Sequence, residues 1–161
     1  MSPKSKSTIA SMVVGAAILV GYLVFTNSAT ASGPQSVQWW ATTILVFIGI
    51  GIIAAIIAQI LFRIFMAIGI SISQGGGDSK EVLRTMNWSL AEDEMDRAIA
   101  NRAARVGYAI SGAGAMGLLL LLAFGGDRVI ALNILFGGFL IGSLVEGVIS
   151  IYGLERGVHV A

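Results

Sequence analysis

The sequence predicts an all-α integral membrane protein, a four-helix bundle whose second and third helices extend into the cytoplasm. The chain of 161 residues is 56% hydrophobic and only 12% charged, whereas a typical soluble domain carries about 25% charged residues. Four apolar segments also approach or exceed the length of about 20 residues that a helix needs to cross a bilayer. They predict one membrane domain covering residues 1–161, with spans at about 9–26, 39–72, 104–125 and 129–153.

The first segment allows two interpretations. Lys4 and Lys6, an apolar core and the run Ala29-Thr30-Ala31 are typical of a signal peptide with its cleavage site. The apolar core is longer, however, than the roughly 7–15 residues of most signal peptides. We therefore expect an uncleaved first span.

The second segment is too long for a simple crossing, so it either continues past the cytoplasmic surface or tilts strongly in the bilayer. Further along, Ser89 and Glu92 have the spacing of a capping box, in which the two side chains satisfy free backbone N–H groups at a helix start. This spacing predicts a helix that begins near Leu90, continues into the third span and ends near Phe124. Residues 74–103 form the predicted cytoplasmic segment.

The distribution of Lys and Arg predicts the orientation, because cytoplasmic loops carry an excess of both. The loop from Asn27 to Gln38 has no charge, and the turn from Gly125 to Arg128 has one basic residue. Both termini and the middle segment are therefore predicted to be cytoplasmic. Their basic residues are Lys4, Lys6, Lys80, Arg84, Arg97, Arg102, Arg105 and Arg156.

The sequence offers little for catalysis or cofactor binding. It has no cysteine and a single histidine, His159, so one chain cannot supply the ligands of a haem, a zinc ion or an iron–sulfur cluster. It contains no Ser-His-Asp set, phosphate-binding glycine loop or dinucleotide fingerprint. The net charge of +1 lacks the excess of Lys and Arg that is typical of nucleic-acid-binding proteins. We expect a non-enzymatic protein with no cofactor, no metal site and no nucleic-acid partner.

Charged residues inside two apolar segments define a candidate functional site. Arg63 in the second span and Glu146 in the fourth each fall about 7 residues, or roughly 10 Å, to the cytoplasmic side of the span midpoint. A charge at that depth is costly and usually marks a partner, a water path or a function. Small residues around Glu146 indicate that it faces protein rather than lipid. The candidate intramembrane polar site comprises Arg63, Glu146, Gln59, Ser143 and Ser150.

Three interpretations of these charges are open. In the first, Arg63 and Glu146 form a structural ion pair that fixes the register of the helices. In the second, Arg63 extends to the lipid headgroups, and Glu146 is protonated or bonded to Ser143 or Ser150. In the third, Glu146 is a proton- or cation-coupled carboxylate in a transport path, with Arg63 or a substrate as its counter-charge.

The helix expected from Leu90 carries small residues on one face, with carboxylates at its cytoplasmic end. Small residues let another helix approach closely, so this is a predicted packing face. The face comprises Asp93, Asp96, Ala100, Ala103, Gly107, Ser111 and Gly114. The charges near its start form a candidate cytoplasmic docking surface of Glu92, Asp93, Asp96 and Arg97. Carboxylate oxygens suit Ca²⁺ or Mg²⁺, but the spacing of a calcium loop is absent.

Two stretches resemble a known family. The run Glu92–Arg97 followed by Arg105-Val106-Gly107-Tyr108 is similar to a signature of the form E-D-E-x-D…R-x-G-Y. The later runs Leu132–Phe136, Gly142–Gly147 and Tyr152…Arg156-Gly157 resemble the end of the same proteins. These are small four-span membrane proteins of prokaryotes with no known function. The resemblance implies a multi-pass protein of the inner (plasma) membrane and carries no activity.

The leading hypothesis is a non-enzymatic accessory or regulatory membrane protein, or an oligomeric scaffold, that docks a partner through residues 81–105. Four short spans bury little area by themselves, so we expect a homo-oligomer or incorporation into a larger membrane complex, in addition to contact with the lipid bilayer. The alternative is a small oligomeric transporter or channel, coupled to ions or protons, that uses Glu146.

Overall fold

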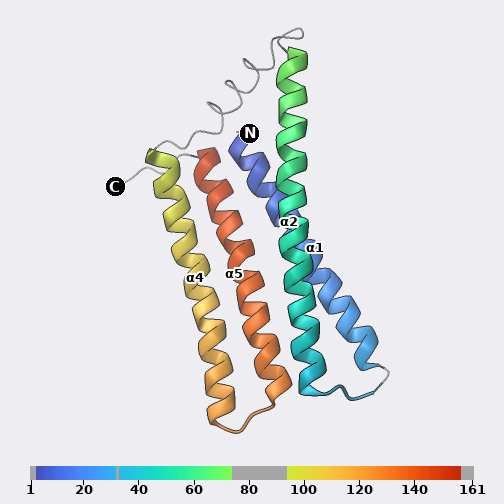
Figure 1. Cartoon of the computed structure of the whole chain (residues 1–161). Helices are drawn as coiled ribbons and strands as arrows, with labels where there is room; N and C mark the ends of the chain where they lie inside the picture. The colour runs from blue at the N-terminus through green and yellow to red at the C-terminus, as the bar shows by residue number, and fades with distance from the viewer. Residues whose placement is uncertain (1–2, 32, 74–93, 157–161) are drawn as a thin grey trace.

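The computed structural model describes residues 3–31, 33–73 and 94–156, and every regular element in these ranges is an α-helix. The helices are α1 (Pro3–Thr30), α2 (Val37–Ser73), α4 (Glu94–Ala123) and α5 (Arg128–Arg156) (Figure 1). All four are long and apolar enough to cross a membrane. The prediction of an all-α, four-span membrane protein is therefore confirmed. The capping box at Ser89 and Glu92 lies outside the described residues.

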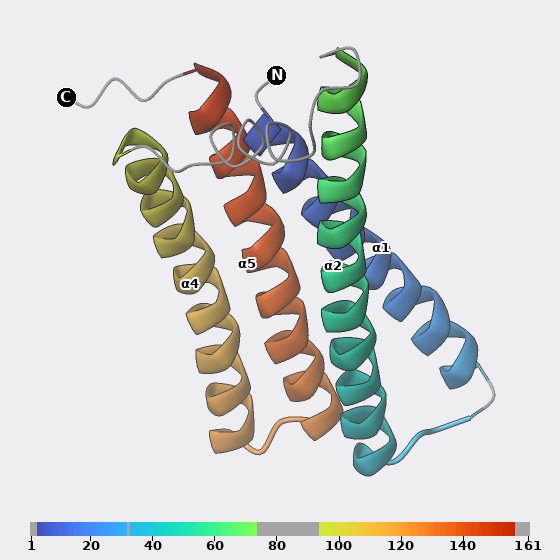
Figure 2. The same ribbon diagram turned by 45° about the horizontal axis from the view of Figure 1, so that its top comes forward.

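Consecutive helices run in opposite directions (Figures 1 and 2). At one end of the bundle, which we name the loop end, α1 leads into α2 and α4 leads into α5. The starts of α1 and α4 and the ends of α2 and α5 lie at the opposite end. This is an up-and-down arrangement of helices.

α2 is the longest helix and reaches beyond the others at the end opposite the loops (Figure 1). Its 37 residues correspond to about 55 Å at 1.5 Å per residue, compared with a bilayer hydrocarbon core of about 30 Å. The helix is therefore longer than a perpendicular crossing requires, as its long apolar sequence predicts.

The turn between α4 and α5 is specified by its own residues. Asp127 caps α5, because its Oδ1 accepts hydrogen bonds from two backbone N–H groups of the first turn, at 2.7 and 3.1 Å. Gly125 has a φ of 71°, where a side chain would be strained. The amides of Gly125 and Gly126 donate back to carbonyls of the last turn of α4, at 3.2 and 2.7 Å, in a Schellman C-cap. The sequence thus ends one helix and starts the next, which brings α4 and α5 side by side.

Small residues bring α4 and α5 into backbone contact. A Cβ placed on Gly138 would lie 2.9 Å from the Cα of Gly114, and one placed on Gly142 would lie 2.7 Å from the carbonyl oxygen of Gly107. Ala103, Gly107 and Gly114 are buried. Such close approach gives membrane helices the van der Waals contact that holds them together in lipid. The predicted small face of α4 is therefore a packing face, and its partner is α5.

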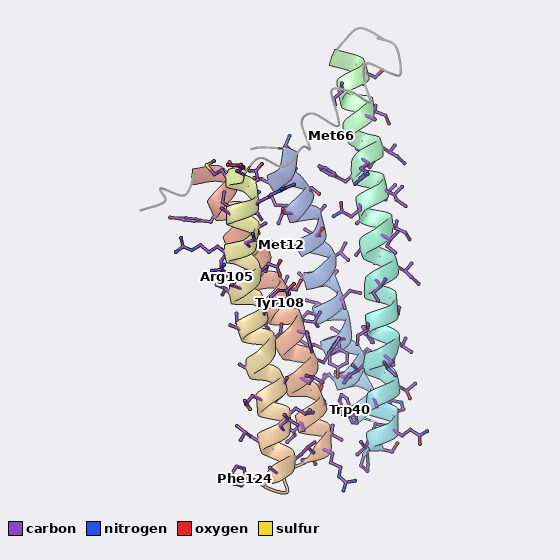
Figure 3. All side chains as sticks on the ribbon, turned by 60° about the vertical axis from the view of Figure 1, so that its left-hand side comes forward. Met12, Trp40, Met66, Arg105, Tyr108 and Phe124 are labelled. Atoms are coloured by element: carbon purple, nitrogen blue, oxygen red, sulfur yellow. The ribbon has the colours of Figure 1, made fainter. Side chains whose placement is uncertain are left out.

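α5 is the central helix of the bundle. It contacts each of the other three, whereas α4 contacts only α5 among the described helices. α1 crosses the bundle obliquely (Figure 2) and packs against both α2 and α5. On α5, a Cβ added to Gly147 would collide with Met12 of α1, which is labelled in Figure 3. Glycine therefore allows α5 to approach α1 as well as α4.

An aromatic cluster ties α1, α2 and α5 together toward the loop end. Its buried centre consists of Tyr22, Trp40, Ile44 and Phe136, and Trp40 is labelled in Figure 3. The ring of Tyr22 meets that of Phe136 edge-on, with 4.7 Å between centroids. The Tyr22 hydroxyl also donates a 2.6 Å hydrogen bond to Oδ1 of Asn133 on α5. The phenol is thus buried with its polar group satisfied.

Replacing Tyr22 with phenylalanine should destabilise the bundle by about 1 kcal/mol or less, because hydrogen bonds between membrane helices contribute about that much. The variant keeps the ring packing and removes only the bond to Asn133. Tyr108→Phe, at a side chain that is 74% exposed, is the matched control and should be neutral. Thermal unfolding in mild detergent, followed by circular dichroism, measures both. Equal unfolding midpoints for Tyr22→Phe and wild type would mean that the hydrogen bond to Asn133 contributes nothing to stability.

Most apolar side chains point out of the bundle. In the most apolar window of each span, only 6–17% of the residues are buried within the chain. α2 in particular exposes large apolar side chains at consecutive positions, such as Ile52 with Ile53 and Ile56 with Ile57. In a membrane protein this surface is covered by lipid tails or by other membrane helices. The described chain is therefore a multi-pass membrane protein whose outer surface suits the bilayer.

Candidate functional site

Glu146 lies on α5 at the contact with α4. Its side chain is half-buried, and a Cβ placed on Gly107 of α4 would lie 2.9 Å from its Oε2. The missing side chain at Gly107 therefore makes room for the carboxylate. Glu146 faces protein rather than lipid, as the small residues around it predict.

A polar cavity of about 290 Å³ opens beside Glu146, between α1, α2 and α5. Hydroxyl groups and one amide, that of Gln59, line it together with the carboxylate. None of the described residues in its lining is basic. The carboxylate is therefore surrounded by neutral groups whose oxygens can bind water, a proton donor or a cation. The hydroxyl groups belong to Ser7, Thr8, Ser11, Ser143 and Ser150.

Gln59 connects α2 to α1 at the wall of this cavity. Its Nε2 donates a 2.8 Å hydrogen bond to Oγ of Ser11, and its Oε1 accepts a 3.4 Å bond from Oγ of Ser7. Ser7 and Ser11 are four residues apart, so they lie on the same face of α1 and one amide reaches both. The two bonds hold α2 against α1 at the depth of the cavity.

Arg63 does not pair with Glu146. The described residues include no ion pair or hydrogen bond between the two. Arg63 is exposed on α2 and lines a second cavity of about 290 Å³, together with Asp96 of α4. At this depth α1 lies between α2 and α5, because it is bonded to Gln59 on one side and packed against Gly147 on the other. The structure thus leaves the second and third sequence interpretations in place.

The two polar cavities adjoin. Gln59 and Ser150, both predicted site residues, line both of them, as do Ser7 and Thr8. The structure therefore brings Glu146, Gln59, Ser143 and Ser150 to one cavity and Arg63 to its neighbour.

Sequence reasoning missed the residues of α1 that line this space. Ser7 and Thr8 precede the predicted first span of residues 9–26, and Ser11 lies at its start, but all three belong to α1. The spacing of four between the two serines is the signal that could have identified them, since it places both on one helix face.

The predicted docking surface is described only in part. Glu92 and Asp93 lie outside the described residues. Asp96 is half-buried and lines the cavity of Arg63, while Arg97 is exposed in the first turn of α4. Within the described ranges, no group of three or more Asp, Glu, His or Cys side chains is placed to hold a metal ion.

Comparisons with known proteins identify no relative. No family model, no curated protein and no solved structure matches the chain. The resemblance to four-span prokaryotic proteins therefore stays a prediction. The helices themselves establish an integral membrane protein with four candidate spans, and the site to be explained is the polar cavity beside Glu146.

Proposed function

We propose that the protein is a small, non-enzymatic transporter of the plasma membrane in which Glu146 binds a proton or a cation. The cavity beside Glu146 carries the proposal, because its described lining combines one carboxylate with neutral polar groups and no basic side chain. A carboxylate without a counter-charge is costly at membrane depth. A proton or a cation removes that cost, and the nearby hydroxyl and amide oxygens supply further hydrogen-bond acceptors or ligands.

The relative depths of the cavity and the aromatic cluster support access to Glu146 from one side of the membrane. The cavity is lined by the early turns of α1, whereas Tyr22 and Phe136 fill the bundle toward the loop end. If the end rich in Lys and Arg is cytoplasmic, ions reach Glu146 from the cytoplasm. In that orientation α2 and α4 extend into the cytoplasm. Carrying an ion across then requires the aromatic cluster to open, with loss of the bond between Tyr22 and Asn133.

Reconstitution of the purified protein into liposomes tests this proposal. A potassium diffusion potential, negative inside, should drive entry of protons or Na⁺, reported by trapped ion-sensitive dyes. The initial rate should rise with the ratio of protein to lipid. Flux that does not exceed that of protein-free liposomes for either ion would contradict a transport function.

One observation supports a docking subunit as a second candidate. α4 contacts only α5 among the described helices, and its first half exposes Glu94, Arg97, Arg102 and Arg105, the last labelled in Figure 3. Exposed charges on an uncovered helix suit a polar partner surface, in a larger complex or a homo-oligomer. A docking subunit should retain a stoichiometric partner in mild detergent and show no flux in liposomes, so the same preparation separates the two candidates.

A further inference from the structure

A third cavity, of about 540 Å³, lies between α1, α2 and α5 on the loop side of Glu146. Its lining is mainly apolar and includes the rings of Phe47, Phe136 and Phe139. Among the described lining residues, only Ser11 and Ser143 have polar side chains. Such a space offers water few hydrogen bonds, so it suits apolar groups.

This apolar cavity adjoins the polar cavity beside Glu146. Ser11, Gly15 and Ser143 line both. We name these two adjoining spaces together the passage; its polar part contains a carboxylate and its apolar part contains aromatic rings. Along α2 the passage extends from Phe47 to Gln59, or roughly 18 Å at 1.5 Å per residue.

We propose that this passage binds an amphipathic organic cation, a molecule with a single ammonium- or phosphonium-type charge on a bulky apolar body. The inference rests on the proposed transport function and names its substrate class. The positive group pairs with Glu146, and the apolar body fills the adjoining cavity. The phenylalanine rings line the space that the apolar body occupies, and their contact adds to the burial of that body.

Charge complementarity distinguishes this occupant from the other amphiphiles of a membrane. The phosphate of a phospholipid would meet the carboxylate of Glu146, and no basic residue is among the described lining of either part of the passage. A small inorganic cation would leave the apolar cavity unfilled. A molecule that is both cationic and apolar matches both parts, in the way that ligand sites combine apolar walls with a few placed polar groups.

Equilibrium dialysis with the full chain in lipid nanodiscs tests the inference, with radiolabelled tetraphenylphosphonium and tetramethylammonium as probes. Both ions carry one positive charge, but only the first has a large apolar body. We expect tetramethylammonium to bind at least about tenfold more weakly, because it buries far fewer apolar groups. Glu146→Gln should weaken tetraphenylphosphonium binding at least about thirtyfold, the effect of removing one partner of a desolvated charge pair.

Two glycines of α2 supply matched steric variants. Gly51 lines the apolar cavity, and a Cβ there would make an ordinary 3.8 Å contact with Ile18, so Gly51→Leu should fill the space. It should weaken tetraphenylphosphonium binding about tenfold, as the loss of roughly two buried methylene groups would. Gly49 has no atom within 4 Å of its Cβ position, so Gly49→Leu should leave binding unchanged. Ala55→Leu is a second filling variant on the same helix.

Circular dichroism of each variant verifies the fold. The inference is overturned if tetraphenylphosphonium binds no better than tetramethylammonium, or if folded Gly51→Leu and Ala55→Leu proteins both bind it as wild type does. Phospholipid that co-purifies with wild type and is lost from Gly51→Leu would also overturn it, in favour of a lipid tail in the cavity. If any of these three results is found while proton or Na⁺ flux persists, the proposed transport function is retained and only the substrate class is wrong. If flux is absent too, the proposed function fails with it.

Discussion

Glu146→Gln should reduce ion flux in proteoliposomes to the rate of protein-free liposomes. Glutamine has nearly the shape of glutamate, so it can keep the contact with Gly107 that positions the side chain between α4 and α5. It has no negative charge and cannot take up a proton at neutral pH. No other acidic side chain is among the described residues that line this cavity, so none replaces the lost carboxylate there. The initial rate of dye response under an imposed potential is the measurement.

Glu155→Gln is the matched control, because it makes the same chemical change at an exposed side chain of the same helix. It should leave the flux unchanged. Thermal unfolding midpoints equal to that of wild type would establish that both variants are folded. Full flux through folded Glu146→Gln protein would mean that ions cross by a path that does not involve this carboxylate.

Gly138→Leu should separate α4 from α5 and destabilise the protein by about 3 kcal/mol, at the upper end of the usual cost of overpacking. The reason is that the first added carbon would already lie 2.9 Å from the Cα of Gly114. Backbone cannot rotate away as a flexible side chain can, so the whole helix must move. Denaturant unfolding in mild detergent, followed by circular dichroism, measures the loss.

Gly137→Leu is the control for this prediction, on the neighbouring residue of the same helix. Its Cβ position has no neighbouring atom within 4 Å, so the free energy of unfolding should change by about 0.5 kcal/mol or less. Equal stabilities for the Gly137 and Gly138 variants would mean that the close contact between α4 and α5 does not hold them together.

Local sequence information is enough to predict the helices and the direction of Glu146. A membrane span must satisfy its backbone hydrogen bonds internally and stay apolar over a fixed length. Each helix can therefore be predicted from its local sequence, without tertiary information. The packing face of α4 can be predicted in the same way, because helical periodicity places Gly107 and Gly114 on one side of the helix. The small residues around Glu146 indicate a protein-facing side chain by the same argument.

The partners of the polar side chains depend on how the helices are tilted and offset, which the periodicity of one helix does not encode. Arg63 and Glu146 are predicted at the same depth, but α1 lies between their helices, so they line neighbouring cavities instead of meeting. The bond from Tyr22 to Asn133 joins residues 111 positions apart and has no local signal at all. The cavities themselves arise only from the arrangement of three helices.

The central place of α5 has a consequence for how the protein is made. α5 is the last of the four described helices in the sequence, yet it is the one that contacts all the others. Helices leave the ribosome in order at about 5–20 residues per second, so α4 is made a few seconds before α5, its one partner among the described helices. During that interval its glycine face and the hydroxyl of Tyr22 are open to lipids, chaperones and membrane proteases. Biogenesis of this bundle is therefore completed only when its last described helix is inserted.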